Sequence, residues 1–220
     1  MLIAIEGIDG SGKGTQAQRL VERLTSSGRR AALLSFPRYD ATFFGRAVGE
    51  FLNGRFGTLA EAHPFLVSLL YAGDRFESRE LLSELAAHND VVVLDRYVPS
   101  NIAHQAAKRD GGDRERLIEW IEHLEYAVYG LPRADRVFLL DLPVWIARSL
   151  IARKQARSYT HRAADLQEAD AAYLERVREL YLELAGRSPE WRRIEVSHEG
   201  VVRSIEEVAD EVWTGCWPGC

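Results

Sequence analysis

Cysteine is nearly absent from this sequence: there are two among 220 residues, Cys216 and Cys220, both within the last five. Two thiols so close together exclude a fold held by disulfides, and a cysteine-based metal site there would lack two ligands. We expect both to be reduced thiols on a terminal tail. A disulfide within the tail, or a vector-derived tail, are the alternatives.

Long apolar runs and an excess of positive charge are also lacking. No stretch approaches the length of uncharged, apolar chain that a membrane span requires, and the N-terminal MLIAIEG is too short for a secretory signal. We therefore expect a cytoplasmic protein with no membrane partner. The formal net charge of −5 argues against nucleic acid as a partner, but it leaves room for a local basic groove that binds a small anion.

Short apolar runs separated by long amphipathic stretches are what the sequence does contain. Unalternating runs of this length suit strands that are buried on both faces of a parallel sheet. The alternation with helical patterns predicts a three-layer, doubly wound α/β fold, and the absence of a linker predicts a single domain over residues 1–220. The expected strands are residues 2–5, 31–36, 91–95, 137–141 and 193–196, and the expected helices are residues 15–24, 64–87, 114–129, 168–185 and 204–213.

Glycines crowd the stretch EGIDGSGKGTQ between the first expected strand and helix. Residues 7–13 fit G-x-x-x-x-G-K, a phosphate-binding loop in which backbone N–H groups and a helix N-terminus surround phosphate oxygens. Lys13 then supplies a cation near the β- and γ-phosphates. The loop alone leaves ATPases, GTPases, sulfotransferase-like enzymes and kinases of small molecules open. The expected contacts are Gly7, Ile8, Asp9, Gly10, Ser11, Gly12, Lys13, Gly14 and Thr15.

The loop departs from the common pattern at Gly14, where Ser or Thr usually follows the lysine. Thr15 is therefore the candidate for a hydroxyl on the magnesium or phosphate side. Alternatively, Thr15 only caps the following helix.

A second charged pair follows the apolar run VVVL, in VVVLDRYVPSNIAHQ. Because the carboxyl ends of parallel strands meet at one edge of a sheet, Asp95 and Arg96 are expected close to the opening of the phosphate loop. Asp95 could hold magnesium through water or orient Lys13, and Arg96 could bind a second phosphate group. A structural ion pair between Asp95 and Arg96 is the alternative.

The motifs together resemble those of thymidylate kinases over essentially the whole chain. They are Asp9 within GIDGSGKGTQ, FPRY at 36–39, YAGDR at 71–75 and DRYVPSN at 95–101. The resemblance implies a P-loop nucleoside-monophosphate kinase fold with a five-stranded parallel sheet, a short basic lid and a homodimeric assembly. It implies transfer of the ATP γ-phosphoryl group to dTMP.

The resemblance also assigns roles to individual residues. Asp9 would contact the sugar 3′-hydroxyl and the reacting phosphate, and Arg96 would bind the dTMP phosphate. Tyr71 would stack on thymine, while Arg75 and Asn101 would bind the base edge. His104 stands where the family commonly has Tyr, near the position of the ribose 2′-hydroxyl. The remaining substrate-side residues of this interpretation are Phe36, Arg38, Tyr39, Ser100, Gln105 and Asp165.

The basic run at about 148–165 could be a solvated helix face, but the resemblance makes it the lid. One subgroup of the family carries an arginine directly after the loop aspartate, where this chain has Gly10, so the lid has to supply the arginine that stabilises the transferring group. Asp165 would fix a lid arginine or substrate, or cap a helix, and Glu168 could approach magnesium or the sugar. The candidate catalytic arginines are Arg153, Arg157 and Arg162.

Two other functions remain open at this point. One is a related kinase with another nucleoside monophosphate or a deoxynucleoside as acceptor. The other is a nucleotide-binding module without turnover.

Overall fold

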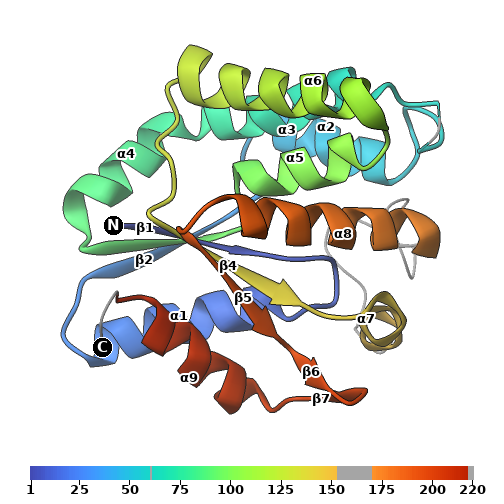
Figure 1. Cartoon of the computed structure of the whole chain (residues 1–220). Helices are drawn as coiled ribbons and strands as arrows, with labels where there is room; N and C mark the ends of the chain where they lie inside the picture. The colour runs from blue at the N-terminus through green and yellow to red at the C-terminus, as the bar shows by residue number, and fades with distance from the viewer. Residues whose placement is uncertain (60, 153–169, 218–220) are drawn as a thin grey trace.

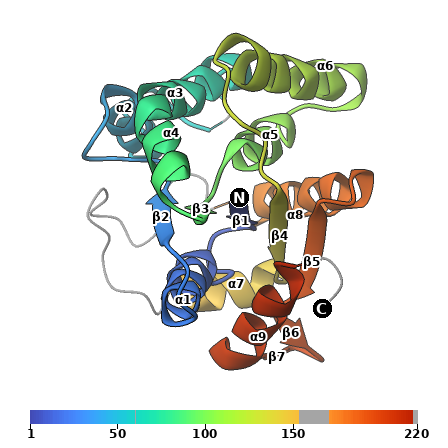
Figure 2. The same ribbon diagram turned by 90° about the vertical axis from the view of Figure 1, so that its left-hand side faces the viewer.

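A five-stranded parallel sheet forms the centre of the molecule in the computed structural model, which describes residues 1–59, 61–152 and 170–217. Its order is β2-β3-β1-β4-β5, with β1 in the middle; Figure 1 views the sheet nearly edge-on, and Figure 2 shows the strands in this order. The expected α/β sheet is thus confirmed, with strand ends shifted by at most two residues. The strands are β1 (Leu2–Glu6), β2 (Ala31–Ser35), β3 (Val91–Asp95), β4 (Arg136–Asp141) and β5 (Trp191–Glu195).

Helices cover both faces of the sheet, which gives the three layers (Figure 2). On one face lie α1 and α9, which pack against each other; α5 and α8 lie on the other face, with α2, α3 and α6 farther out. The helices are α1 (Lys13–Ser26), α2 (Phe43–Leu52), α3 (Pro64–Glu77), α4 (Arg79–His88), α5 (Val98–Ala106), α6 (Gly111–Glu122), η1 (His123–Val128), α7 (Val144–Ile151), α8 (Ala171–Arg187) and α9 (Ile205–Gly215). A hairpin of β6 (Ser197–His198) and β7 (Val201–Val202) precedes α9.

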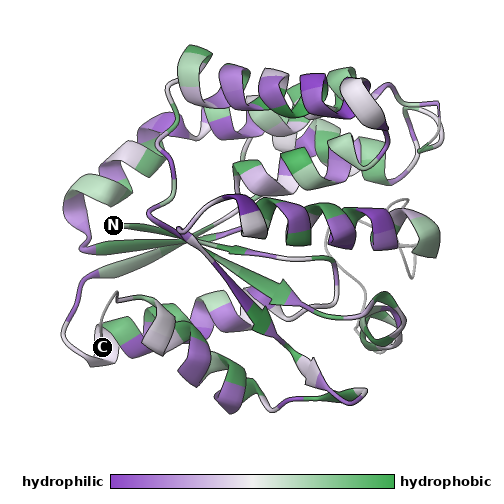
Figure 3. Ribbon diagram, in the orientation of Figure 1, coloured by the Kyte–Doolittle hydropathy of each residue, from purple (hydrophilic) through white to green (hydrophobic). Residues whose placement is uncertain are grey.

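The core lies along the central strands, whose residues are mostly apolar (Figure 3). Every residue of β1 is buried, as expected for a strand covered on both sides. In the register of the sheet, Ile5 pairs with Asp95 of β3 and with Phe138 of β4. The carboxyl ends of the three strands therefore meet at one edge, where the loop after β1 also opens.

Two of the expected helices are interrupted. The pattern over residues 64–87 forms α3 and α4 with a break at Ser78, whose hydroxyl donates to the carbonyl of Asp74. The pattern over 114–129 ends in the π-helix η1. Hydrophobic periodicity does not distinguish a continuous helix from one that is broken or widened by a turn.

Cys216 is buried rather than part of a loose tail, which corrects the expectation for this thiol. It caps the end of α9, and its thiol donates to the carbonyl of Val212. Burial raises the pKa of Cys216 to about 11, so the group stays a thiol near neutral pH. Cys220 lies outside the described residues.

Membrane insertion finds no support in the helices that the structure describes. None of them combines the length and the hydropathy that crossing a bilayer requires.

The contact between α2 and α3 gives a test of the packing, because α3 offers Gly73 where a larger residue has no room. A Cβ atom at Gly73 would lie 2.6 Å from the ring of Phe44. Overpacking a closed contact costs about 1–3 kcal/mol, and the higher helix propensity of alanine offsets up to about 1 kcal/mol of that cost. We therefore expect Gly73→Ala to lower the free energy of unfolding by about 1–2 kcal/mol, as measured by urea denaturation.

Gly186→Ala is the matched control in α8. A Cβ atom at Gly186 would meet no neighbouring heavy atom within 4 Å beyond its own helical turn, and the site is exposed. We expect this variant to be as stable as the wild type or up to about 1 kcal/mol more stable. Equal stability of Gly73→Ala and the wild type would contradict the packing argument.

Candidate active site

The loop between β1 and α1 curls tightly because two of its glycines meet neighbouring backbone. Gly7 has φ 143° and Gly10 has φ 85°, conformations that favour glycine. A Cβ at Gly7 would lie 2.6 Å from the carbonyl oxygen of Leu140, and one at Gly10 equally close to that of Ala147. These glycines therefore allow the loop to pack against the end of β4 and against α7, in addition to leaving room for a ligand.

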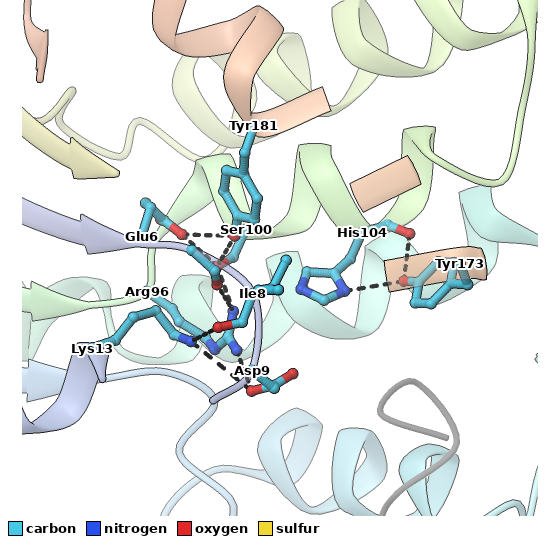
Figure 4. A network of polar contacts seen from close by, with 10 residues as sticks. Glu6, Ile8, Asp9, Lys13, Arg96, Ser100, His104, Tyr173 and Tyr181 are labelled. Carbon is cyan, nitrogen blue, oxygen red and sulfur yellow. Dashed lines mark hydrogen bonds and ion pairs between the residues drawn. The ribbon is translucent and has the colours of Figure 1, made fainter. Parts of the chain in front are cut away.

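Lys13 lies across the inside of this loop (Figure 4). Its ammonium donates to the carbonyl of Ile8 at 2.8 Å and lies 4.0 Å from Asp9 Oδ1. Burial, together with the charge of Arg96, lowers the pKa of Lys13 to about 8. The Lys13 ammonium is therefore disfavoured in the free protein. A bound anion, such as a phosphate group, would raise its pKa again and favour the charged form.

Arg96 is the second cation at this edge, and it follows β3 with φ 66°, which is unusual for a residue with a side chain. Its guanidinium donates to Asp9 Oδ1 at 2.5 Å, to the carbonyl of Gly7 at 3.3 Å and to Ser100 Oγ at 3.1 Å. Burial opposes its charge, but Asp9 raises the pKa of Arg96 well above its ordinary value. The alternative of an Asp95–Arg96 ion pair is wrong, because Arg96 pairs with Asp9.

A buried carboxyl group supports Arg96 from behind. Glu6 accepts hydrogen bonds from the Ser100 hydroxyl at 2.6 Å, the Tyr181 hydroxyl at 2.9 Å and the backbone N–H of Tyr97 at 2.7 Å. Burial raises the pKa of Glu6, and these donors with Arg96 counteract that rise. Because Ser100 in turn accepts from Arg96, Glu6 holds the arginine through it.

A pocket opens beside this cluster, and Figure 4 shows the side chains at one of its ends. Most residues predicted on the substrate side line it, and Pro37 and Leu52 join them. Arg38 does not line it: its guanidinium donates to Ser78 Oγ at 3.1 Å. The predicted residues that the pocket brings together are Asp9, Phe36, Tyr39, Tyr71, Arg75, Arg96, Ser100, Asn101, His104 and Gln105.

His104 closes part of the pocket wall with the help of Tyr173 on α8. The Tyr173 hydroxyl donates to the His104 carbonyl at 2.8 Å and lies 3.0 Å from Nδ1 of its ring. Burial, assisted by the charge of Arg96, lowers the pKa of His104 to about 3, so this ring stays neutral and contributes shape rather than charge.

Another buried ion pair supports the pocket at Arg75. Its Nε and Nη2 donate to the two oxygens of Glu125 at 2.5 and 2.7 Å, and Asn101 donates to the same carboxylate at 2.8 Å. Arg75 and Asn101 line the pocket, whereas Glu125 lies behind them.

Two of the side chains predicted on the magnesium side, Asp95 and Thr15, lie at the N-terminus of α1 and could offer oxygen ligands. A Cβ at Gly14 would lie 3.1 Å from Asp95 Oδ2, so this carboxylate is beside the first turn of the helix. Thr15 is exposed in that turn and does not cap it, because the N-cap is Gly12. Among the described residues, no three His, Cys, Asp or Glu side chains form a metal cage. This donor set fits Mg²⁺, which is commonly held by one or two carboxylates, water and substrate phosphates.

The predicted lid lies largely beyond what the structure covers. Arg148 belongs to α7 and is exposed. The five residues assigned to catalysis, substrate or metal in this part of the chain lie outside the described residues: Arg153, Arg157, Arg162, Asp165 and Glu168.

Four supporting residues escaped the sequence interpretation: Glu6, Glu125, Tyr173 and Tyr181. Glu6 ends an apolar run, and the other three sit in amphipathic helical patterns where carboxylates and tyrosines are common. No local signal marked them, because their partners come from distant parts of the chain.

Comparison with known proteins points to one family. The family model described as "Thymidylate kinase" matches residues 5–212. The thymidylate kinase of Mycobacterium tuberculosis (strain ATCC 25618 / H37Rv) is 37% identical over 185 residues, which cover 84% of this chain and 86% of that protein. The probable thymidylate kinase of Thermococcus onnurineus is 33% identical over 218 residues, covering 96% and 95%.

A solved structure gives the same result. The thymidylate kinase of Candida albicans superposes with a TM-score of 0.74 at 26% sequence identity, and the match covers 97% of this chain and 89% of that one.

The buried position of Lys13 has a cost in stability that can be measured. Its pKa is about 8 in the folded protein against an ordinary 10.5, a difference that corresponds to about 3 kcal/mol of disfavoured charge. We therefore expect Lys13→Met to raise the free energy of unfolding by about 1–3 kcal/mol at pH 7, as measured by urea denaturation without nucleotide.

The advantage of Lys13→Met should shrink as the pH rises from 8 to 10.5. In that range the unfolded lysine still binds a proton that the folded protein has lost, so the wild type gains stability with pH. A Lys13→Met protein that is less stable than the wild type at pH 7 would contradict this account.

Proposed function

This chain belongs to the thymidylate kinase family and transfers the γ-phosphoryl group of ATP to dTMP, giving dTDP and ADP, and we propose that the cluster of Lys13, Asp9 and Arg96 is where the two nucleotides meet. The observation that carries this proposal is that both cations lie at one edge of the sheet, Lys13 at the start of α1 and Arg96 directly after β3. They lie beside a pocket lined by aromatic and polar side chains.

The phosphate of dTMP displaces the Asp9 carboxylate from the Arg96 guanidinium and accepts its hydrogen bond in place of Asp9 Oδ1. Arg96 is already held by Gly7 and Ser100, so its guanidinium is positioned before substrate arrives. The Asp9 carboxylate, once displaced, is within reach of the 3′-hydroxyl of the sugar as a hydrogen-bond acceptor. Exchange of one anion for another keeps a largely buried arginine paired throughout.

The donor ATP binds through the loop N–H groups and Lys13. These groups hold the β- and γ-phosphates in line with the acceptor and offset their charge. Asp95 and the Thr15 hydroxyl would hold Mg²⁺, which supplies further neutralisation of the phosphates when bound. A lid arginine, one of Arg153, Arg157 and Arg162, would complete the charge stabilisation, since Gly10 offers no side chain.

The base lies deeper in the pocket. Tyr71 and Phe36 offer aromatic faces on which a pyrimidine can stack, which is worth about 1–3 kcal/mol in single-stranded nucleic acids. Arg75 and Asn101 face the base edge. Tyr39, His104 and Gln105 form the wall beside the sugar.

Replacement of the acceptor-side cation tests this assignment. We expect Arg96→Ala to lower kcat/KM for dTMP by about 10²–10³-fold, because the acceptor phosphate loses a preorganised charged donor. ADP formation is measured with a coupled assay for dTMP, dUMP, dCMP, AMP and thymidine, with dTMP as the best acceptor of the wild type.

Arg30→Ala is the control, since Arg30 lies at the start of β2, at the opposite edge of the sheet, and pairs with Asp90. It should leave kcat/KM unchanged. Equal activity of Arg96→Ala and wild type would overturn the phosphate assignment. Another preferred acceptor would favour the related-kinase function, and ATP binding without dTMP-dependent ADP formation would favour the non-catalytic module.

We also propose that residues 1–220 act as one kinase domain in the cytoplasm and that two copies form a homodimer. Support for the dimer comes from large apolar side chains exposed on α2, α3 and η1, where a second copy would cover them. They are Phe43, Leu66, Phe76 and Val128.

Charge placed on this surface should separate the copies. Leu66 is 65% exposed, and we expect Leu66→Glu to shift the protein from dimer to monomer in light scattering coupled to gel filtration, because a charge would be buried unpaired at the contact. Trp145→Glu on α7, at the same exposure, should leave the mass unchanged. A wild-type monomer would contradict the proposal.

A further inference from the structure

Glu125 is a fully buried carboxylate that the reaction scheme above does not use. It lies on the π-helix η1 and has 0% exposure, and it does not line the pocket. A carboxylate taken out of water loses a large solvation energy, so its position calls for strong partners.

Those partners are the two residues that face the base. Oε1 accepts from Arg75 Nη2 and from Asn101 Nδ2, and Oε2 accepts from Arg75 Nε. The two nitrogens that bind Glu125 lie on one edge of the guanidinium, which directs the third nitrogen of Arg75 away from the carboxylate.

The same contacts fix the orientation of the Asn101 amide. Its nitrogen donates one proton to Glu125 at 2.8 Å and the other to the carbonyl of Ser68 at 3.0 Å. Both partners can only accept, so the amide cannot turn over without placing its oxygen against two acceptors. Asn101 Oδ1 is left buried, with no hydrogen-bond partner among the described residues.

We propose that Glu125 is a positioning residue that sets the hydrogen-bond polarity of the base site: Asn101 presents an acceptor and Arg75 presents a donor. This inference rests on the base binding at Arg75 and Asn101. Thymine fits such a pair, because its ring N–H can donate and the adjacent carbonyl can accept. Cytosine has the opposite pattern, with an unprotonated ring nitrogen beside an amino group, and would leave buried groups unpaired.

A glutamine at position 125 would break this pattern in either of its orientations. With the amide oxygen toward Asn101, the new NH₂ group faces the N–H of Arg75 Nε, and the guanidinium is displaced. With the NH₂ group toward Asn101, the Asn101 amide has to turn over and presents a donor to the pocket. Both outcomes weaken the preference for thymine.

The test compares kcat/KM for dTMP with kcat/KM for dCMP. In Glu125→Gln we expect this ratio to fall at least tenfold, through loss with dTMP and relative gain with dCMP. Glu125→Asp keeps a group that can only accept, so it should retain the ratio while both values of kcat/KM fall together.

Asp141→Asn is the matched control for the loss of a buried charge. Asp141 is a buried carboxylate held by Arg178 and Arg193 and is not part of the pocket. Its substitution should leave the ratio unchanged even where stability falls. The inference is overturned if Glu125→Gln keeps the wild-type ratio or if Asp141→Asn lowers the ratio as much.

A measurement on the wild type keeps the inference testable if Glu125→Gln does not fold. The two side-chain N–H signals of Asn101 should be protected from solvent exchange in NMR spectra, both with and without dTMP, because both protons are bonded away from the pocket. Rapid exchange of either proton would overturn the inference. A wild type without preference for dTMP over dCMP would instead count against the placement of the base.

Discussion

The ion pair between Arg96 and Asp9 is the interaction on which the rest of the site depends. The Arg96 side chain is 15% exposed, and an unpaired charge at such a position would cost several kcal/mol. Asp9 and the Gly7 carbonyl belong to the loop after β1, and Ser100 belongs to α5, so Arg96 ties the phosphate loop to the helix that lines the pocket. The strained backbone at Arg96 is therefore compensated by three contacts on two different elements.

The same design recurs at both ends of the pocket. At one end Glu6 holds Ser100 and, through it, Arg96; at the other end Glu125 holds Arg75 and Asn101. In each case a buried carboxylate behind the wall accepts hydrogen bonds and so determines which atoms face the ligand. Because a carboxylate can only accept, it orients its partners more strictly than a hydroxyl or an amide would.

The parts of this architecture that sequence predicts are those with a short-range signal. The strands are uniform apolar runs, and the phosphate loop is a contiguous motif. Asp95 and Arg96 end and follow an apolar run, and in a parallel sheet the carboxyl ends of the strands share one edge, which predicts where these residues lie. The break at Ser78 was not predictable, because the periodicity of the flanking residues continues across it.

Long-range support is what a single sequence leaves out. Tyr181 lies 175 positions from Glu6, and Glu125 lies 50 positions from Arg75. A carboxylate or tyrosine on an amphipathic helix is usually a surface residue, so only the folded arrangement shows that these are buried and shared between elements. The base site thus combines two kinds of residue. Arg75 and Asn101 belong to sequence motifs, whereas Glu125, which holds both of them, belongs to none.

Two cations in one small, largely buried site favour a ligand that carries several negative charges. Burial and the charge of Arg96 together lower the pKa of Lys13. Holding the two cations close to each other therefore lowers the stability of the free protein. Phosphate groups that bind here reverse this effect at Lys13, because the ammonium gains an anionic partner while Arg96 exchanges Asp9 for a phosphate. The charged form of Lys13 is thus disfavoured in the free protein and favoured in the complex, and this difference strengthens the binding of a ligand with several negative charges.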